Sequence, residues 1–576
     1  MNDHKNKRSR VLAALCSVIC VMSAMPAMSA SAAAAKYEAE DAVISGQRIT
    51  VENGSGYSGG KYVALATNNI NSSLTFKVNA DESGIYDVVV RASGIGADKT
   101  NRLKVDGVVA ANIISEKDKL GDSKTVQTYL SKGSHDITIT PTDGYINVDY
   151  ITVEKGVAKD YAKGVSKELI NENASDSAKR LMSFIVDNYG VNTIAGQQCD
   201  GTGGSGYGLN GGEIKAIEEQ TGRKPALLGL DLMNLNNVLD GATEFSEAGG
   251  IVSLCWHWRA PTKYVKEGND SNGNPYSWSA FNTSSLKDFD FDAIMNGEDE
   301  DGYNKLMFTV DNIAKKLQQL DEADIPILFR PLHEASGGWF WWGSGSPESY
   351  KKLWITLYDK FTNEYGINNL IWVWNGQDKD WYPGDEYVDI IGEDIYPGKH
   401  VYRAQSVRFD DAANYTETPK VVTLSENGCL FDPFQAGVLN TVWSWFCVWN
   451  GDFTFNKSGI SQTYTEKYMW NYVYNHQNVI TLDEMPDLKT YPLTGGTPVK
   501  SKETDYSAEL ALGDINADGK VDSKDALLSI SFAKKATTPK NDQQLLAADI
   551  DGSGDIKTND ALKIIAYAKK TIKKLP

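Results

Sequence analysis

The sequence has few cysteines for its length, and this shortage excludes several classes of protein. Only 6 of the 576 residues are cysteine, and Cys16 and Cys20 fall within an N-terminal leader. The others are Cys199, Cys255, Cys429 and Cys447. They match no zinc-ligand spacing and are too sparse for a disulfide framework. We therefore expect buried thiols, with one disulfide bridge as the alternative.

Positive charge is also in short supply. The chain carries 57 Lys and Arg against 76 Asp and Glu, a formal net charge of −19. This balance argues against nucleic acid or an anionic membrane as a partner. It suits a soluble secreted protein or a cation binder, and solubility alone explains most of it.

Beyond the N-terminus, no apolar run is long enough for a membrane-spanning helix. The N-terminus itself reads as an export signal: Lys5, Lys7, Arg8 and Arg10 precede the apolar run 11–21, and small residues follow. We assign residues 1–32 to a signal peptide, with cleavage expected between Ala30 and Ala35. The protein is therefore expected to be extracellular.

The composition is that of a folded protein, with 41% apolar and 10% aromatic residues. The length predicts two to four domains. Residues 36–155 contain short alternating runs separated by Gly, Asn and Asp, which is typical of a β-sandwich. The expected strands are 62–65, 74–78, 86–90, 135–139 and 148–153.

Acidic residues stand at both ends of this sandwich. Glu38 and Glu40 open it and Asp149 lies in its last strand. Because the first and last strands of a sandwich can be neighbours, these carboxylates could converge on one calcium ion. The segments 37–40, 56–63 and 147–151 resemble carbohydrate-binding module family 35. That resemblance implies structural calcium at these carboxylates and sugar binding by Tyr145 and Asn147. The alternative for Tyr145 is a half-buried aromatic with no ligand.

After a linker at 156–165, strands alternate with amphipathic stretches from 166 to 495. The eight candidate strands are 192–197, 226–232, 251–256, 327–332, 370–374, 390–395, 421–425 and 442–448. Helical patterns at 303–321 and 347–365 lie between them. This alternation predicts a (β/α)8 barrel whose active site lies at the carboxyl ends of the strands.

Two glutamates follow barrel strands on opposite sides of the expected mouth. Glu334 comes after the fourth strand, beside His333 and before a Trp-rich run at 339–342. Glu426 closes the seventh strand. A pair of carboxyl groups across a sugar-binding mouth is the apparatus of glycoside hydrolysis, with retention at about 5–5.5 Å and inversion at about 6.5–9.5 Å. Tryptophan faces suit sugar rings.

The barrel resembles glycoside hydrolase family 26 in the motifs 330–334, 337–343, 424–426, 256–258 and 392–396. The resemblance implies a retaining endo-β-1,4-mannanase with Glu334 as acid/base and Glu426 as nucleophile. It also implies that His257, His333, Trp339, Asp394 and Tyr396 line the sugar subsite. We expect Trp339 to form an apolar floor, Tyr396 to donate a hydrogen bond to Glu426, and Glu393 to support the site without reacting. Of Trp341 and Trp342, we expect one to pack at the barrel rim. No cofactor is expected in catalysis.

After a linker at 496–507, residues 508–576 carry two loops with EF-hand-like spacing, each followed by an apolar-periodic helix. The expected metal ligands of the first are Asp514, Asn516, Asp518, Lys520, Asp522 and Asp525. Those of the second are Asp549, Asp551, Ser553, Asp555 and Asp560. Lys557 occupies position nine of the second loop and cannot ligate calcium, so its affinity is expected to be weaker.

The duplicated loop and helix resembles a type I dockerin, which implies a cohesin domain of a scaffoldin as partner. A generic calcium-stabilised tail is the alternative. The whole chain is thus expected to be a secreted mannanase held in a cellulosome, with a monomeric catalytic unit and mannan as substrate. Two rivals stay open: a β-glucanase (lichenase) or xylanase with the same apparatus, and a non-catalytic carbohydrate adhesin.

Overall fold

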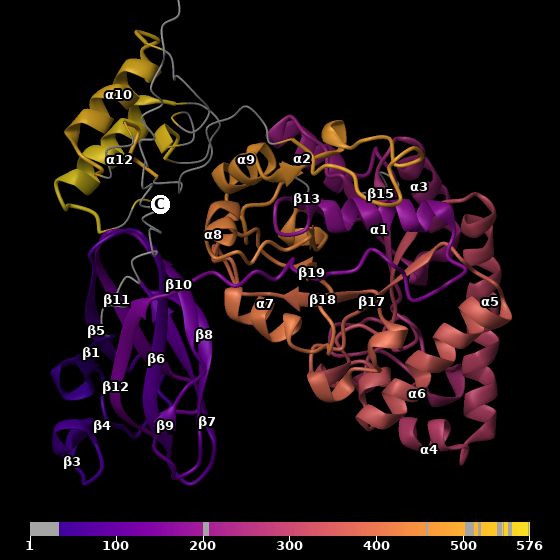
Figure 1. Cartoon of the computed structure of the whole chain (residues 1–576), viewed down its shortest axis with the longest axis horizontal. Helices are drawn as coiled ribbons and strands as arrows, with labels where there is room; N and C mark the ends of the chain where they lie inside the picture. Colours follow the sequence, from indigo (N-terminus) through magenta and orange to yellow (C-terminus); the bar gives the residue numbers. More distant parts are fainter. Residues whose placement is uncertain are drawn as a thin grey trace, which may run out of the picture.

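The chain folds into three bodies in the computed structural model (Figure 1). The structure describes residues 34–199, 207–456, 459–500, 512–516, 520–537, 544, 547–550, 556–573 and 575. The predicted signal peptide at 1–32 lies outside these residues. Within them, no helix has the length and apolarity to cross a membrane.

The first body is a β-sandwich, as predicted. Its larger sheet contains β1 (Ala35–Glu38), β3 (Ile49–Asn53), β4 (Lys61–Leu65), β6 (Gly84–Gly94), β9 (Gly121–Asp122), β10 (Val126–Leu130) and β12 (Ile146–Lys155). The smaller sheet has the order β2 (Val43–Ser45), β5 (Ser73–Ala80), β11 (Gly133–Pro141), β7 (Lys99–Val105) and β8 (Val108–Ser115). Alternate side chains, among them Val88, Val90, Ile137 and Ile139, form the shared core. The first and last strands pair antiparallel, with Glu38 opposite Tyr150, which confirms that they are neighbours.

The second body is a closed barrel of eight parallel strands. They are β13 (Thr193–Gln198), β14 (Leu227–Asp231), β15 (Ile251–Cys255), β16 (Ile327–Arg330), β17 (Leu370–Trp374), β18 (Ile390–Ile395), β19 (Val421–Asn427) and β20 (Trp445–Val448). β13 pairs with both β14 and β20, which closes the barrel. Strands such as β17 are buried on both faces, which explains their unbroken apolar sequence. Each predicted barrel strand overlaps an observed one.

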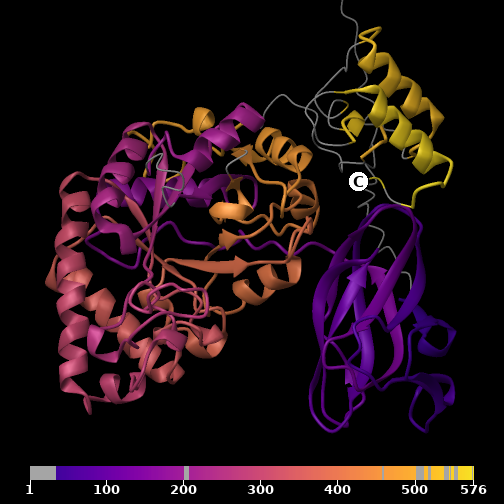
Figure 2. The ribbon, with the colours of Figure 1, turned by 180° about the vertical axis from the view of Figure 1, so that it is seen from behind.

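Helices cover the barrel on its outside (Figures 1 and 2). They are α1 (Asp176–Asn188), α2 (Gly212–Thr221), α3 (Leu235–Glu247), α4 (Phe291–Asn296), α5 (Glu300–Glu322), α6 (Pro347–Tyr358), α7 (Ser406–Ala413), α8 (Pro433–Val438) and α9 (Lys467–Asn475). Local sequence sets their starts: the side chains of Asp299 and Ser346 cap α5 and α6. Short strands β21 (Phe455–Asn456) and β22 (Gly459–Ile460) form a hairpin, and β23 (Val479–Ile480) pairs with β13.

The third body contains helices α10 (Ser523–Ala533) and α12 (Thr558–Ala568), the two helices predicted after the loops. They pack around a small core that includes Ile515, Phe532 and Ile564.

The sandwich is docked on the barrel at α7. Arg403 donates from Nη1 to Thr128 Oγ1 at 3.1 Å and from Nη2 to the Val105 carbonyl at 2.8 Å. Ser406 Oγ donates to the Gln127 carbonyl at 2.9 Å, and Val407 packs against the sandwich core. Tyr129 of β10 also packs edge-on against Phe434 of α8, with the ring centres 5.8 Å apart. These polar and apolar contacts fix the orientation of the sandwich relative to the barrel.

Cys199, Cys255, Cys429 and Cys447 are buried, and no disulfide joins any of them within the part of the chain that the structure describes. The predicted buried thiols are confirmed, and the alternative disulfide is not formed there.

Candidate active site

The predicted site residues of the barrel meet at the carboxyl ends of its strands. Glu334 follows β16, Glu426 lies near the end of β19, and Asp394 lies in β18. One carboxylate oxygen from each of these three residues lies within 4.8 Å of the other two. Two residues separated by 92 positions are therefore brought face to face, as the count of strands predicted.

The turn that carries Glu334 has an unusual backbone. Leu332 and Glu334 both adopt left-handed conformations, with φ of 52° and 54°. The Glu334 amide donates to the Asn375 carbonyl at 2.7 Å, which ties the turn to the end of β17. A Cβ on Gly343 would lie 2.1 Å from the Ala335 carbonyl oxygen, so only glycine allows this close return of the chain. The motif thus aims Glu334 into the mouth.

Glu334 is surrounded so that it holds a proton near neutral pH. Burial, reinforced by the negative charge of Glu426, raises the pKa of Glu334 to about 7. Trp339 opposes this shift, because its Nε1 donates to Glu334 Oε2 at 2.8 Å. Trp339 is half exposed at the mouth. The expected apolar floor is therefore also a hydrogen-bond donor to the acid, which the sequence did not reveal.

Arg330 is a buried cation shared by the two other carboxylates. Its Nη1 lies 2.7 Å from Asp394 Oδ2 and its Nη2 lies 2.7 Å from Glu426 Oε2. Although burial opposes the charge, these carboxylates hold the pKa of Arg330 well above its usual range. Three carboxylates face one guanidinium, which leaves an excess of negative charge that a proton on Glu334 relieves. Arg330 belongs to a motif the sequence singled out, yet its role was not predicted.

Tyr396 donates a hydrogen bond from its hydroxyl to Glu426 Oε1, as expected. The ring follows β18 and is 42% exposed, so one edge faces solvent while the hydroxyl touches the carboxylate. Together with Arg330 Nη2, 2.7 Å from Glu426 Oε2, this hydrogen bond fixes the position of the Glu426 carboxylate in the mouth.

The two histidines form a chain with an aspartate that sequence reasoning missed. His257 Nδ1 lies 2.7 Å from Asp231 Oδ2, and His257 Nε2 lies 3.3 Å from His333 Nε2. Although burial would lower it, the Asp231 carboxylate raises the pKa of His257. Burial and the charge of Arg330 lower the pKa of His333 well below its usual range. Asp231 was detectable only as a polar residue at the end of a barrel strand.

Two of the residues expected to line the sugar subsite are instead buried within the barrel. His333 is 1% exposed, and the side chain of Asp394 is fully buried between Arg330 and Ser425. Glu393 lies outside the mouth, paired with Arg408, in line with a supporting role. Both Trp341 and Trp342 are buried, and their Nε1 atoms donate to the carbonyls of Trp258 and His333. Both are therefore packing residues.

A pocket of about 340 Å³ lies beside His257. Its lining combines aromatic rings with polar groups, a mixture suited to a sugar. The residues are Gln198, Asp231, Met233, His257, Trp278, Phe281, Trp449 and Asn450. Trp278 was not predicted, because it lies in a long loop without a local motif.

The acidic residues of the sandwich gather around Ser58. The Ser58 amide donates to Asp149 Oδ1 at 2.8 Å and its hydroxyl to Glu38 Oε1 at 2.7 Å. Among the described residues, no hydrogen bond reaches the buried Glu38 Oε2 and Glu40 Oε2 atoms. Oxygen atoms of this kind fit calcium. Lys36 also lies 2.8 Å from Glu38.

The predicted sugar contacts of the sandwich are half-buried. Tyr145 lies beneath the Lys99 ammonium, 5.8 Å from the ring centre. The Asn147 side-chain amide donates to the Tyr57 hydroxyl at 3.4 Å.

The first C-terminal loop is organised by Asp525. Its carboxylate is buried and accepts from the amides of Ile515, Asn516 and Asp522. The expected ligands Asp518, Asp551, Ser553 and Asp555 lie outside the described residues. Asp549 and Asp560 are buried at the ends of the second loop.

Three family models match separate parts of the chain. Glycosyl hydrolase family 26 matches residues 170–484, carbohydrate binding module family 35 matches residues 35–156, and the dockerin type I domain matches residues 512–568.

Similar proteins share the first two of these parts. A mannan endo-1,4-beta-mannosidase of Thermothelomyces thermophilus is 33% identical over 466 residues, which cover 79% of this chain and 91% of that protein. The crystal structure of a Podospora anserina GH26-CBM35 beta-(1,4)-mannanase is 32% identical with a TM-score of 0.54, and covers 79% of this chain and 99% of that one. A ruminal GH26 endo-beta-1,4-mannanase is 28% identical with a TM-score of 0.58, over the same shares of the two chains.

Proposed function

This chain belongs to glycosyl hydrolase family 26, and on that basis we propose that it is a secreted mannan endo-1,4-β-mannosidase. Its substrate is β-1,4-mannan, including galactomannan and glucomannan, which it cuts at internal bonds. The names of its relatives and the sugar-binding character of the mouth support this substrate.

The observation that carries the proposal is the close approach of Glu334 and Glu426. Their oxygens lie within 4.8 Å, which supports double displacement with retention rather than inversion. Glu426 attacks the anomeric carbon while Glu334 gives its proton to the departing glycosidic oxygen. Glu334 then takes a proton from water, which attacks the same carbon and releases Glu426.

The electrostatics of the site support both roles of Glu334. In the free enzyme, the charge of Glu426 helps to keep Glu334 protonated, ready to act as an acid. When Glu426 becomes an ester with the sugar, its charge disappears and the pKa of Glu334 falls. Glu334 is then ionised and able to act as a base.

Substrate contacts are assigned to the exposed groups of the mouth. Trp339 and Tyr396 offer accessible rings, and His257 lines the neighbouring pocket. His333 and Asp394 are enclosed, so we assign them positioning roles: His333 holds His257, and Asp394 holds Arg330 against Glu426.

Azide rescue tests the two glutamates. With an aryl β-mannobioside that has a good leaving group, Glu334→Ala should form a β-mannosyl azide and Glu426→Ala an α-mannosyl azide. On mannan, each variant should lose about 10²–10⁴-fold or more in kcat. Glu300→Ala, on the outer helix α5, is the matched control and should retain full activity. Normal turnover by Glu426→Ala would contradict the nucleophile assignment.

The same carboxylate pair would serve a β-glucanase or a xylanase. Side-by-side rates on mannan, lichenan and xylan separate these activities, and mannan is expected to be cut fastest. The pairing of both glutamates argues against an adhesin that binds sugar without cutting it.

We assign accessory functions to the flanking domains. The sandwich binds carbohydrate through Tyr145 and Asn147, with a structural calcium ion held by Glu38, Glu40 and Asp149. The C-terminal domain binds calcium through its two loops and docks on a cohesin of a scaffoldin, which makes the enzyme a component of a cellulosome. The match to dockerin type I supports this partner.

A further inference from the structure

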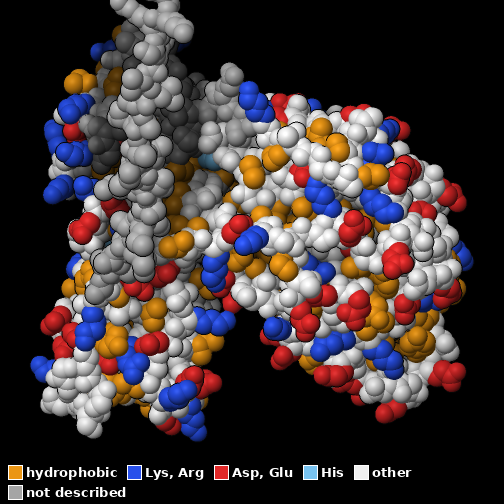
Figure 3. Space-filling view, viewed as in Figure 1, with side chains coloured by type: hydrophobic (Ala, Val, Ile, Leu, Met, Phe, Trp, Pro, Cys, Tyr) orange, Lys and Arg blue, Asp and Glu red, His pale blue; other side chains and the backbone are white. Residues whose placement is uncertain are grey.

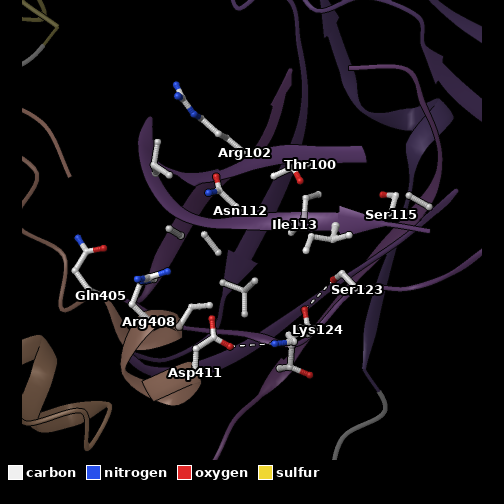
Figure 4. A pocket seen from close by; sticks show the side chains of 18 of the residues that line it. Thr100, Arg102, Asn112, Ile113, Ser115, Ser123, Lys124, Gln405, Arg408 and Asp411 are labelled. Atoms are coloured by element: carbon white, nitrogen blue, oxygen red, sulfur yellow. Dashed lines mark hydrogen bonds and ion pairs between the residues drawn. The ribbon is translucent and has the colours of Figure 1, made fainter. Parts of the chain in front are cut away.

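A cleft of about 790 Å³ lies between the sandwich and the barrel. One wall is formed by β7, β8 and the segment from Gly121 to Val126; the other is formed by the loop after β18 and by α7. Figure 3 shows the molecule hollowed between the two domains, and Figure 4 shows Asn112 on β8 across from Gln405 and Arg408.

Tyr396 is shared by the cleft and the barrel mouth. Tyr396 lines the cleft, and the hydroxyl of the same residue donates to Glu426. A chain that lies across the barrel mouth and passes Tyr396 therefore enters the space between the domains. Of the described residues that line this space, Tyr396 alone is aromatic.

The cleft has fixed walls. Arg403 and Ser406 hold α7 to β10 and to the end of β7. Within the cleft, Lys124 of the sandwich lies 3.0 Å from Asp411 of α7. A site assembled from two domains is useful only when their arrangement is fixed, and these contacts supply that.

The lining suits a neutral, hydroxyl-rich ligand. The charge of Arg408 is balanced by Glu393 and that of Asp411 by Lys124. Arg102 and Asn112 are exposed on the sandwich wall and Gln405 faces them from the barrel, which gives amide and guanidinium groups for hydroxyls. Ile114 and Val109 add apolar surface for the C–H faces of sugars. The lining holds three cations (Arg102, Lys124 and Arg408) and three carboxylates (Glu116, Asp122 and Asp411), so it has no net charge that would favour an anionic polymer.

We propose that this interdomain cleft extends the catalytic groove and binds further units of the same β-mannan chain beyond Tyr396. The inference rests on the proposed mannanase function. The volume of the cleft falls within the range of about 300–1,000 Å³ typical of ligand sites, which is enough for a short run of sugars. Binding energy gained there, remote from the reacting bond, contributes to the cleavage of long chains.

Asn112→Trp, which places a large ring in the cleft, is the direct test. Its kcat/KM on linear mannan should fall about three- to tenfold, equivalent to the loss of a few sugar contacts. Its kcat/KM on reduced mannotriose should not change, because so short a chain does not reach the cleft. Asn79→Trp is the matched control: an exposed asparagine on β5 of the same sheet, outside the cleft, with no expected effect on either substrate.

A double variant, Arg102→Ala with Asn112→Ala, removes contacts without adding bulk and should give the same dependence on chain length. Equal kcat/KM values of Asn112→Trp and Asn79→Trp on mannan would overturn the proposal that the cleft binds mannan. They would leave the proposed mannanase function intact. An equal loss on mannotriose and mannan would also overturn it, because the effect would then lie at the catalytic centre. No hydrolysis of mannan by the unmodified chain would contradict both proposals.

Discussion

The proton on Glu334 is set by three neighbours with opposing effects. Burial and the charge of Glu426 raise its pKa to about 7, and the Trp339 indole lowers it. In the proposed mechanism, Glu334 must be protonated to assist departure of the leaving group. We therefore expect kcat/KM to decline as the pH rises above about 7.

Trp339→Phe should move this decline to higher pH. The indole N–H stabilises the ionised carboxylate, so its removal raises the pKa of Glu334, by about one pH unit for a charge-assisted hydrogen bond. The measurement is the pH dependence of kcat/KM on an aryl mannoside. Trp278→Phe, which removes an indole from the neighbouring pocket, should leave the pH of the decline in kcat/KM unchanged. A decline at lower pH in Trp339→Phe would contradict the role assigned to the indole.

Arg330→Met should destabilise the fold, because it leaves Asp394 and Glu426 buried without a cation. We expect a loss of about 3–5 kcal/mol in the free energy of unfolding at pH 7, measured by urea denaturation. Burial raises the pKa of Asp394, so the loss should shrink as the pH is lowered and that carboxyl group takes up a proton. The exposed Arg102→Met is the control and should change stability by less than about 0.5 kcal/mol. A loss independent of pH would point to packing instead of charge.

The barrel strands could be predicted because each is a short apolar run between helices, and burial on both faces leaves that signal in the sequence. The pairing of Glu334 with Glu426 followed from the order of strands. The link between Asp231 and His257 did not, because it depends on the register of β14 and β15. Arg330 was hidden for the same reason: a buried arginine is interpretable only when its two carboxylate partners are known.

The two C-terminal loops are expected to differ in calcium affinity. Both are followed by helices, α10 and α12, but Lys557 occupies the ninth position of the second loop, where Asp522 stands in the first. Chelation by EGTA should expose residues 512–575 to protease, because metal binding supplies folding free energy to such small domains. Mass spectrometry of the fragments from the full chain provides the readout.

The comparison of single variants separates the two loops. Asp514→Ala should raise the calcium concentration needed for protection more than Asp549→Ala does. The reverse order would show that the second loop binds calcium more tightly, and protection unaffected by EGTA would contradict a role for calcium.

The arrangement of the whole molecule depends on a small set of contacts between sandwich and barrel. Arg403 makes two of the hydrogen bonds, and Val407 and the Tyr129–Phe434 ring pair supply apolar contact. Nothing in the local sequence around Arg403 indicates a domain contact, so this arrangement could not be predicted. Interfaces that consist of few contacts permit relative domain motion once an anchor is lost.

Arg403→Ala should allow the sandwich to move relative to the barrel. We expect a larger maximum dimension by small-angle X-ray scattering and, on long mannan, a loss of activity similar to that of Asn112→Trp. Lys77→Ala, which breaks an ion pair within the sandwich, should change neither quantity. An unchanged scattering profile for Arg403→Ala would show that the remaining contacts suffice.

The left-handed backbone at Leu332 and Glu334 has a consequence for attempts to make the enzyme heat-tolerant. Residues with a side chain adopt this conformation at a cost of about 1–3 kcal/mol each, so the turn that carries Glu334 lowers the stability of the barrel. Relaxing this turn, for example by Leu332→Gly, would change the direction of the Glu334 side chain and lower kcat. Laboratory evolution for thermal endurance should therefore leave this turn alone and improve the outer helices and loops.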